Sequence, residues 1–382
     1  MKGLPVGWKM VTVGDVCDKA SSNVSQNQLE KEVGDYPIFG ASGLIKNVSF
    51  YHQPKPYLSI VKDGSGVGRV TKMEAYTSVI GTLQYILPKQ DIDLDYLYYN
   101  LISIDFKKYV AGAAIPHIYF KDYKSEPFLW MPLPDQQRIV ALLDEAFSAI
   151  AKAKANAEQN LKNAKALFES YLQGVFEVGN WDVKKLNEIT EVKDGTHDSP
   201  KYIKEGIPFV TQKNIRAKGL SFTDTKFITD IDHEKFYKRS NVANGDILIS
   251  MIGANRGMAA VVDDNRVFSI KNVGLIKQSG NINTYFLLYY LKSPLAMKYV
   301  MDKSNGGAQE FIGLTALRSF PIPFPSLQTQ QTIVGQLDSL QAETQKLEII
   351  YQQKIDALEE LKKSILQKAF AGELTSEKAV AV

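Results

Sequence analysis

The chain has little of the residues that build disulfide or metal frameworks. It contains one cysteine, Cys17, and four scattered histidines among 382 residues. A single cysteine excludes a disulfide framework and a Cys-rich zinc module, and dispersed histidines argue against a histidine-based metal site. We therefore expect neither a metal nor another cofactor.

Long hydrophobic runs and a strong charge of one sign are also missing. No stretch approaches the length that spans a membrane, and residues 1–8 contain no apolar signal-peptide core. The 45 Lys and Arg residues are nearly balanced by 42 Asp and Glu residues, so net charge alone does not indicate a polyanionic partner. With an ordinary globular composition, the sequence predicts a cytoplasmic protein of two or three domains.

What the sequence does contain is an internal repeat over nearly its whole length. An offset of 194 pairs residues 170–176 with residues 364–370, whereas an offset of 173 pairs Trp8 with Trp181. The offset grows because the second copy carries insertions, the largest of 16 residues between about positions 187 and 245. Ordered matches of this kind indicate a duplicated unit.

Each copy combines a globular part with one long helix. Short β-branched runs such as 57–61 and 246–250, separated by turn residues, predict strands, and segments 93–110 and 283–300 predict helices. Segments 135–176 and 328–370 lack proline and predict single long helices. The expected parts are listed here in chain order: globular 1–134, helix 135–178, globular 179–326, helix 327–373 and tail 374–382.

Apolar residues in both long segments recur at alternating spacings of four and three. The pattern extends from Ile139 to Tyr171 and from Ile333 to Ile365, which is typical of a coiled coil. The first seam is rich in alanine and the second in Leu and Tyr, so we expect the two helices to pack on each other. An antiparallel register would place Asn160 opposite Thr344, and these two polar side chains would fix the register. The expected fold class is α+β, with two mixed α/β parts joined by an antiparallel coiled coil in a pseudo-two-fold repeat.

Basic residues are in excess on the globular parts rather than on the helices. Residues 1–134 carry 14 basic and 13 acidic groups, and residues 180–325 carry 20 and 15. A nucleic-acid surface and an ordinary solvated surface explain so small an excess equally well.

A glycine-rich loop follows the predicted strand 57–61. Gly64, Gly66 and Gly68 resemble a nucleotide-binding loop, but Arg69 stands where a dinucleotide fingerprint requires glycine. The repeat partner 253–257 keeps only the outer glycines, so a shared tight turn is the preferred interpretation. Such a turn would still present Arg69 or Arg256 to phosphate or guanine.

Two histidines lie in polar loops. His197 stands in Asp-Gly-Thr-His-Asp, residues 194–198, without a nucleophile beside it, so a polar binding loop is favoured over a catalytic base. His117 follows a proline, and a turn or a base contact are equally good interpretations. The sequence contains no triad, P-loop or metal-ligand pattern.

Several of these motifs together resemble the specificity subunits of type I restriction–modification enzymes. The resemblance covers almost the whole chain and depends on the tryptophans 8 and 181, the loop 194–200, and the helix starts 132–139 and 325–333. It implies two target-recognition domains on spacer helices, a split and asymmetric double-stranded DNA target, and recruitment of two methyltransferase subunits and of restriction–translocation subunits. It also implies that catalysis, including base flipping and methylation, belongs to the partners.

Candidate DNA contacts are side chains with basic, amide, hydroxyl or imidazole groups in the globular parts. They are Arg69, Lys72, His117, Thr196, His197, Lys201, Lys213, Asn214, Arg216, Asn255 and Arg256.

Two other classes of protein are alternatives to this one. A free-standing methyltransferase would need an Asn/Asp-Pro-Pro-Tyr/Phe tetrapeptide, and the sequence has none. The other alternative, a coiled-coil scaffold whose globular ends bind proteins, is not excluded by the sequence.

Overall fold

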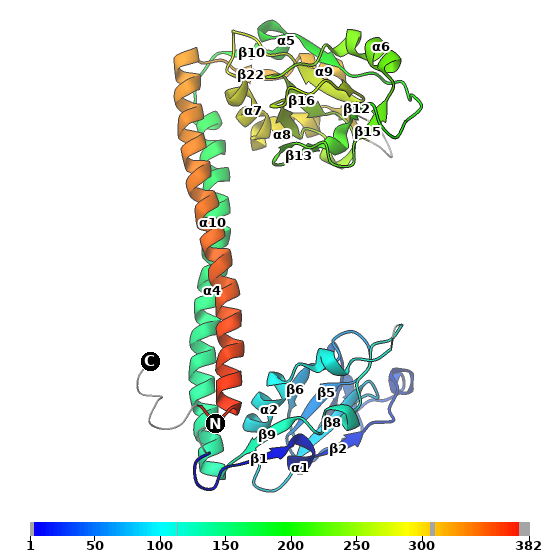
Figure 1. The fold of residues 1–382 in the computed structure, drawn as a ribbon, viewed down its shortest axis with the longest axis vertical. Helices are drawn as coiled ribbons and strands as arrows, with labels where there is room; N and C mark the ends of the chain where they lie inside the picture. The colour runs from blue at the N-terminus through cyan, green and yellow to red at the C-terminus, as the bar shows by residue number, and fades with distance from the viewer. Residues whose placement is uncertain (1–3, 113, 306–309, 374–382) are drawn as a thin grey trace. The chain divides into compact units, whose positions relative to one another are not determined.

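The computed structural model describes residues 4–112, 114–305 and 310–373, and the chain divides into two compact units (Figure 1). Unit 1 contains residues up to 158 and from 352 onward, and unit 2 contains residues 159–351. Both units include a globular part and a segment of each long helix, α4 (Leu133–Val178) and α10 (Leu327–Phe370). Over the described ranges, no helix is long and apolar enough to cross a membrane.

Each globular part is built on a four-stranded antiparallel sheet with the same strand arrangement. The strands of unit 1 are, across the sheet, β2 (Cys17–Ser21), β8 (Leu83–Pro88), β5 (Tyr57–Val61) and β6 (Val70–Met73). Those of unit 2 are β11 (Val192–Asp194), β19 (Val273–Ile276), β16 (Ile247–Ser250) and β17 (Ala259–Val261). The predicted strands 57–61 and 246–250 are thus confirmed as equivalent central strands.

The smaller sheets repeat as well. A three-stranded sheet with one parallel pair is formed by β4 (Gly43–Val48), β3 (Tyr36–Gly40) and β7 (Ser78–Val79) and, in unit 2, by β15 (Lys226–Ile228), β12 (Ile207–Val210) and β18 (Ser269–Ile270). Two-stranded pairs are β1 (Lys9–Thr12) with β9 (Pro127–Trp130) and β10 (Val183–Lys185) with β22 (Pro321–Pro323). The sequence repeat is therefore a structural repeat.

Helices cover these sheets, and two of the predicted helical segments are interrupted. The segment 93–110 forms α2 (Leu94–Ser103) and a 3-10 turn, and 283–300 forms α7 (Thr284–Lys292) and α8 (Pro294–Asp302). Ser293 ends α7 and caps α8 by accepting a hydrogen bond from the Ala296 N–H, and Pro294 suits the first turn of a new helix. The short helices are α1 (Val13–Val16), α3 (Phe120–Tyr123), α5 (Leu186–Ile189) and α9 (Leu314–Arg318).

The insertions in the second copy lie in two connections. Between β12 and β15 the chain forms the hairpin β13 (Ile215–Arg216) and β14 (Gly219–Leu220), and between β15 and β16 it forms α6 (Asp230–Ser240). The short strands β20 (Ser304–Asn305) and β21 (Phe311–Ile312) form a further pair.

The long helices pack antiparallel within each unit. In unit 1, the N-terminal residues Ile139 and Leu143 of α4 share a core with Leu366 of α10. In unit 2, the C-terminal residue Phe176 of α4 shares a core with Leu337 of α10. The predicted antiparallel coiled coil is confirmed.

The buried stripe on these helices keeps the predicted seam residues Ala157 and Ala164 but departs from the heptad at other positions after Ala157. Four residues that the heptad pattern places inward are 37–50% exposed: Leu167, Tyr171, Leu347 and Leu361. The stripe moves to the next residue along α4, because a straight helix drifts about 20° per heptad. Asn160 is therefore exposed, and the Thr344 hydroxyl donates to carbonyls of its own helix. The predicted pairing of Asn160 with Thr344 is not formed.

Candidate nucleic-acid interface

Strand register brings the candidate loops of each globular part to one end of its four-stranded sheet. In unit 1, β2 ends at Ser21 and β5 ends at Val61, and these two residues pair with the adjacent residues 84 and 83 of β8. In unit 2, β11 ends at Asp194 and β16 ends at Ser250, and these two residues pair with the adjacent residues 274 and 273 of β19. We call this edge the loop end. It comprises 22–26, 62–69 and 114–118 in unit 1 and 195–200, 251–258 and 271–272 in unit 2.

The glycine-rich loop is a tight turn that occurs in both units. Gly64 and Gly68 have positive φ values of 89° and 86°, and the Gly68 N–H donates to the Val61 carbonyl at 2.9 Å. Gly253 and Gly257 also have positive φ, and the Gly257 N–H donates to the Ser250 carbonyl at 2.8 Å. The geometry matches a shared turn that reverses the chain between two strands.

Arg69 and His117 lie at the loop end of unit 1. Arg69 is exposed, and one guanidinium nitrogen donates to the Ala41 carbonyl at 2.9 Å. His117 is half-buried in a segment that pairs with Asp63, and the Gly64 N–H donates to the Pro116 carbonyl at 2.8 Å. Arg69 and His117 are thus carried on adjoining backbone segments of the loop end.

Lys72 lies elsewhere in unit 1. Its ammonium group forms an ion pair with Asp95 at the start of α2 and lies 4.9 Å from the centre of the Tyr98 ring. The side chain therefore fastens β6 to α2 and does not belong to the loop end.

A polar network shapes the loop end of unit 2. The buried Asp194 carboxylate accepts two hydrogen bonds from the Arg239 guanidinium, at 2.6 and 3.0 Å. The His197 ring is held between Asp194 at 3.0 Å and the Asn272 amide at 2.8 Å. Thr196 is buried, and its hydroxyl accepts from the Asp198 N–H. Asp194 and Arg239 thus order the loop that carries His197, whose ring face stays open to solvent.

The other candidates of unit 2 differ in what their side chains contact. Lys201, Lys213, Arg216 and Asn255 are exposed. Arg256, in contrast, is ion-paired with Glu310, and its Nε donates to Ser304 Oγ at 3.0 Å.

Asn214 has a structural role. It is 4% exposed, its amide oxygen accepts from the Thr211 N–H, and its amide nitrogen donates to Ser221 and Thr225. Because the side chain is buried and its amide nitrogen already donates to two groups of the protein, Asn214 is not among the proposed DNA contacts.

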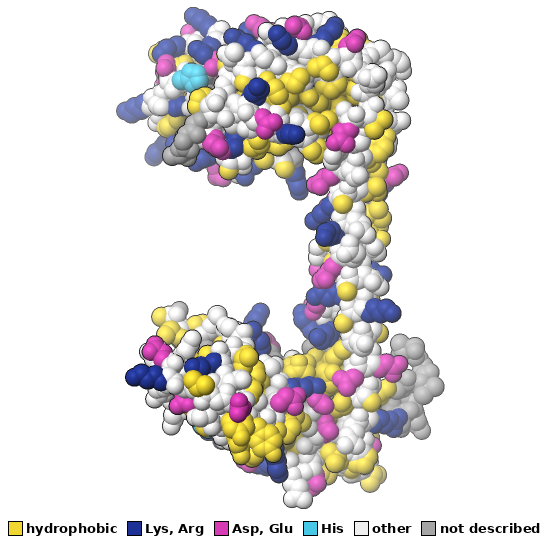
Figure 2. Space-filling view, turned by 180° about the vertical axis from the view of Figure 1, so that it is seen from behind, with side chains coloured by type: hydrophobic (Ala, Val, Ile, Leu, Met, Phe, Trp, Pro, Cys, Tyr) yellow, Lys and Arg dark blue, Asp and Glu magenta, His cyan; other side chains and the backbone are white. Residues whose placement is uncertain are grey.

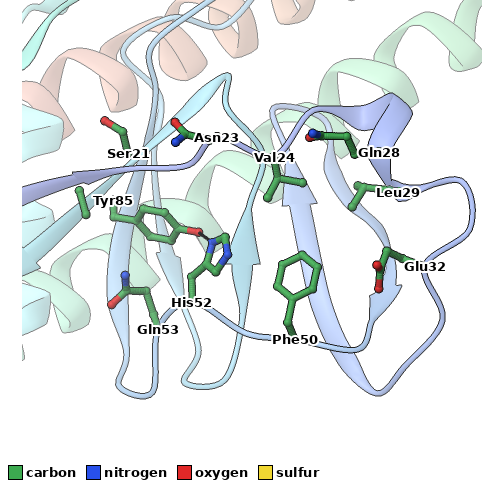
Figure 3. Close-up of a pocket in the computed structure, with 11 residues that line it drawn as sticks. Ser21, Asn23, Val24, Gln28, Leu29, Glu32, Phe50, His52, Gln53 and Tyr85 are labelled. Carbon is green, nitrogen blue, oxygen red and sulfur yellow. Dashed lines mark hydrogen bonds between the residues drawn. The ribbon is translucent and has the colours of Figure 1, made fainter.

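Sequence reasoning missed a pocket of about 620 Å³ beside β2 in unit 1 (Figure 3). His52 stacks on Phe50, and its Nδ1 lies 2.9 Å from the hydroxyl of buried Tyr85. Burial lowers the pKa of His52, which favours a neutral ring. Asn23 and Gln53 also line the pocket. No local motif indicates this pocket, because folding brings together residues from 20–32, 50–53 and position 85.

Charged groups of both signs are interspersed on the surface of each unit (Figure 2). Within the part of the chain that the structure describes, no three His, Cys, Asp or Glu residues are placed to hold a metal ion.

The fold defines a protein of two repeated modules, each with a polar loop end and each packed on its own segments of α4 and α10. The family described as the type I restriction modification DNA specificity domain matches residues 5–162 and 179–360. The chain belongs to this family.

Relatives and solved structures agree with that assignment. The chain is 24% identical over 411 residues to the type I restriction enzyme MjaVIII specificity subunit of Methanocaldococcus jannaschii, covering 98% of this chain and 95% of that one. Its fold is similar to the HsdS subunit from Thermoanaerobacter tengcongensis, with TM-score 0.63, 18% identity and coverage of 97% and 98%. A chain from a structural study of type I R-M complex assembly gives TM-score 0.74 at 18% identity, covering 98% of this chain and all of that chain.

Proposed function

We propose that this chain is the DNA sequence-specificity subunit of a type I restriction–modification complex and binds a bipartite, asymmetric target. The observation that carries the proposal is that one sheet scaffold occurs twice with different loop ends. Residues 1–134 and 179–326 are the target-recognition domains, and each reads one half-site. Segments 135–178 and 327–373 are the spacers between them.

The proposed contacts are the exposed candidates at or near the loop ends. Arg69 and Arg216 suit the acceptor atoms of guanine in the major groove, whereas Lys201 and Lys213 suit phosphates. His117, His197 and Asn255 present ring or amide groups from ordered loops. Thr196 and Arg256 support these loops from within the protein, and Lys72 joins β6 to α2.

The partners are two methyltransferase subunits, one for each recognition domain, together with restriction–translocation subunits. The duplicated helix starts, residues 132–139 and 325–333, offer two equivalent docking places. The chain itself is non-catalytic and cytoplasmic, and the methyl-transfer chemistry is supplied by its partners.

Selection from a pool of randomised 40-base-pair duplexes tests the proposal. We expect the full chain, co-expressed with its methyltransferase subunit, to enrich two different sequence blocks separated by a fixed gap. Methylation should then map to adenines within these blocks and should require the partner. Enrichment of no DNA sequence, with co-purification of other proteins instead, would favour the coiled-coil scaffold.

A further inference from the structure

Gln136, in the first turn of α4, fastens this helix to the start of α2. Its side chain is fully buried, and its Oε1 accepts from the Asp93 N–H at 2.9 Å. Its Nε2 donates to the carbonyls of Asp91 at 2.9 Å and Met131 at 2.8 Å. Asp93 is also the N-cap of α2. One amide therefore joins the long helix, the residue that follows β9 and the cap of the domain helix.

Gln330 forms the equivalent junction in unit 2. It is fully buried in the first turn of α10, and its Oε1 accepts from the Asn283 N–H at 2.7 Å. Its Nε2 donates to the Pro325 carbonyl at 2.9 Å. Asn283 caps α7, as Asp93 caps α2.

A second polar contact lies further along the same pairs of helices. The Tyr99 hydroxyl of α2 donates to Asp144 of α4, and the Tyr289 hydroxyl of α7 donates to Asp338 of α10 at 2.6 Å. Each aspartate is eight residues beyond the buried glutamine, which is about 12 Å along the helix. Two anchors at that separation fix both the position and the rotation of one helix against the other.

The choice of polar groups matters here. Apolar packing is non-directional and tolerates small shifts between surfaces, whereas a buried amide loses its hydrogen bonds when either helix moves. Both anchors occur at equivalent places in the two units, although the loop ends differ.

We infer that Gln136, Gln330, Tyr99 and Tyr289 are positioning residues that hold each recognition domain at a fixed angle on its helices and thereby set the gap between half-sites. This inference rests on the proposed bipartite recognition of DNA. None of the four side chains needs to touch DNA.

The test compares the gaps that variants of the full chain select from the randomised duplex pool. The first variant combines Gln136→Met with Gln330→Met, which keeps the side-chain length and removes the amide. A milder variant combines Tyr99→Phe with Tyr289→Phe and keeps the rings. The control combines Gln137→Met with Gln331→Met, one residue further along, where both glutamines are exposed.

We expect the positioning variants to select the wild-type sequence blocks with a broadened range of gaps. The preference for the wild-type gap over one longer by one base pair should fall roughly tenfold, which corresponds to about 1.4 kcal/mol. The control should keep a single gap. If the glutamine variant does not fold, the tyrosine variant decides the outcome.

A single wild-type gap in a folded positioning variant would overturn the inference, as would an equal broadening in the control. Failure of the wild-type chain to select two blocks is a different result and would overturn the proposed function itself.

Discussion

The two recognition domains share a scaffold and differ at the loop end. The strand arrangement is the same in the sheet β2-β8-β5-β6 of unit 1 and the sheet β11-β19-β16-β17 of unit 2. The same glycine turn follows β5 in unit 1 and β16 in unit 2. Their connections are not alike. Residues 41–42 join β3 to β4, whereas residues 211–225 join β12 to β15 and include a hairpin. The scaffold thus fixes where the loops emerge, and the loops carry the difference.

One position shows the same contrast at the level of a single residue. The first strand of the sheet ends at Ser21 in unit 1 and at Asp194 in unit 2. Ser21 is exposed, whereas Asp194 is buried and organises Arg239 and His197. Equivalent scaffold positions therefore support different polar surfaces, which is what recognition of two unlike half-sites requires.

The largest expected effect comes from changing the helices that both domains share. Seven residues added to α4 between Ala153 and Ala157, and to α10 between Leu347 and Tyr351, lengthen each helix by roughly 10 Å, or about three base pairs of DNA. Three base pairs also rotate the duplex by roughly 100°. We expect binding at the original gap to fall at least about a hundredfold, since the contacts of one half-site are lost. Gel shifts with duplexes of graded gap length provide the measurement.

A longer insertion sharpens that experiment. Adding 21 residues, three heptads, to each helix at the same places keeps the seam in phase and gives roughly 32 Å, close to one full turn of DNA. Binding should then return at a gap about ten base pairs longer. Unchanged affinity for the original gap in both variants would show that helix length does not set the spacing.

The next largest effect is on stability and is obtained by removing the difference between Ser21 and Asp194. Asp194→Ser gives unit 2 the residue of unit 1 and leaves Arg239 without its buried carboxylate. We expect the free energy of unfolding of unit 2 to fall by about 2 kcal/mol, less than for a fully buried pair because Arg239 is half exposed. Urea unfolding is followed by tryptophan fluorescence in a background with Trp8→Phe and Trp130→Phe, where Trp181 is the remaining tryptophan and reports on unit 2.

Asp198→Ser is the matched control, because this carboxylate forms an exposed ion pair with Lys235. Surface pairs contribute little, so stability should barely change. Equal losses in the two variants would contradict a special role for Asp194.

The sequence predicted the parts of the fold whose signal is local. The long helices follow from periodicity within one segment, and the strand 57–61 follows from a short β-branched run between turn residues. The repeat follows from comparing the chain with itself. The predicted seam was wrong at Asn160, Leu167 and Tyr171, whereas Ala164 is buried as predicted. Periods of 3.5 and 3.6 residues place the same side chains inward over the first turns of a helix and diverge only later.

Side-chain roles in the loops were harder to predict. Asn214 and Lys72 have the chemistry of DNA contacts, but their roles depend on partners brought near by folding, such as Thr225 and Asp95. The pocket around His52 depends on pairing between distant strands and has no local motif. Sequence therefore indicates the loops, whereas tertiary structure decides which of their groups face outward.

A smaller effect separates the two half-sites. Arg69→Ala should relax one position of the first half-site, and Arg216→Ala one position of the second, each costing about 1–3 kcal/mol of discrimination. Lys72→Ala is the control in unit 1, because its side chain contacts Asp95 and not the loop end. Selected-sequence profiles of the three variants give the measurement. A change at the same half-site for both arginines would show that the domains do not read DNA independently.

The smallest expected effect concerns pH and again compares one residue in each unit. Burial lowers the pKa values of His52 in unit 1 and His233 in unit 2 below the ordinary value of 6.5. In each case Nδ1 contacts a hydroxyl group, that of Tyr85 or Ser269, so a neutral ring can accept a hydrogen bond there.

As the pH falls below 6.5, the histidine takes up a proton in the unfolded chain before it does so in the folded protein. The free energy of unfolding therefore decreases as the pH falls from 6.5 to the lower pKa of the folded state. His52→Gln should therefore reduce the loss of unfolding free energy between pH 7.5 and 5.5 in unit 1, and His233→Gln should do so in unit 2. Urea titrations at the two pH values, with hydrogen exchange of β5 and β16 amides to distinguish the units, measure each loss. If either variant keeps the full wild-type loss in its own unit, burial of that histidine does not make the unit sensitive to acid.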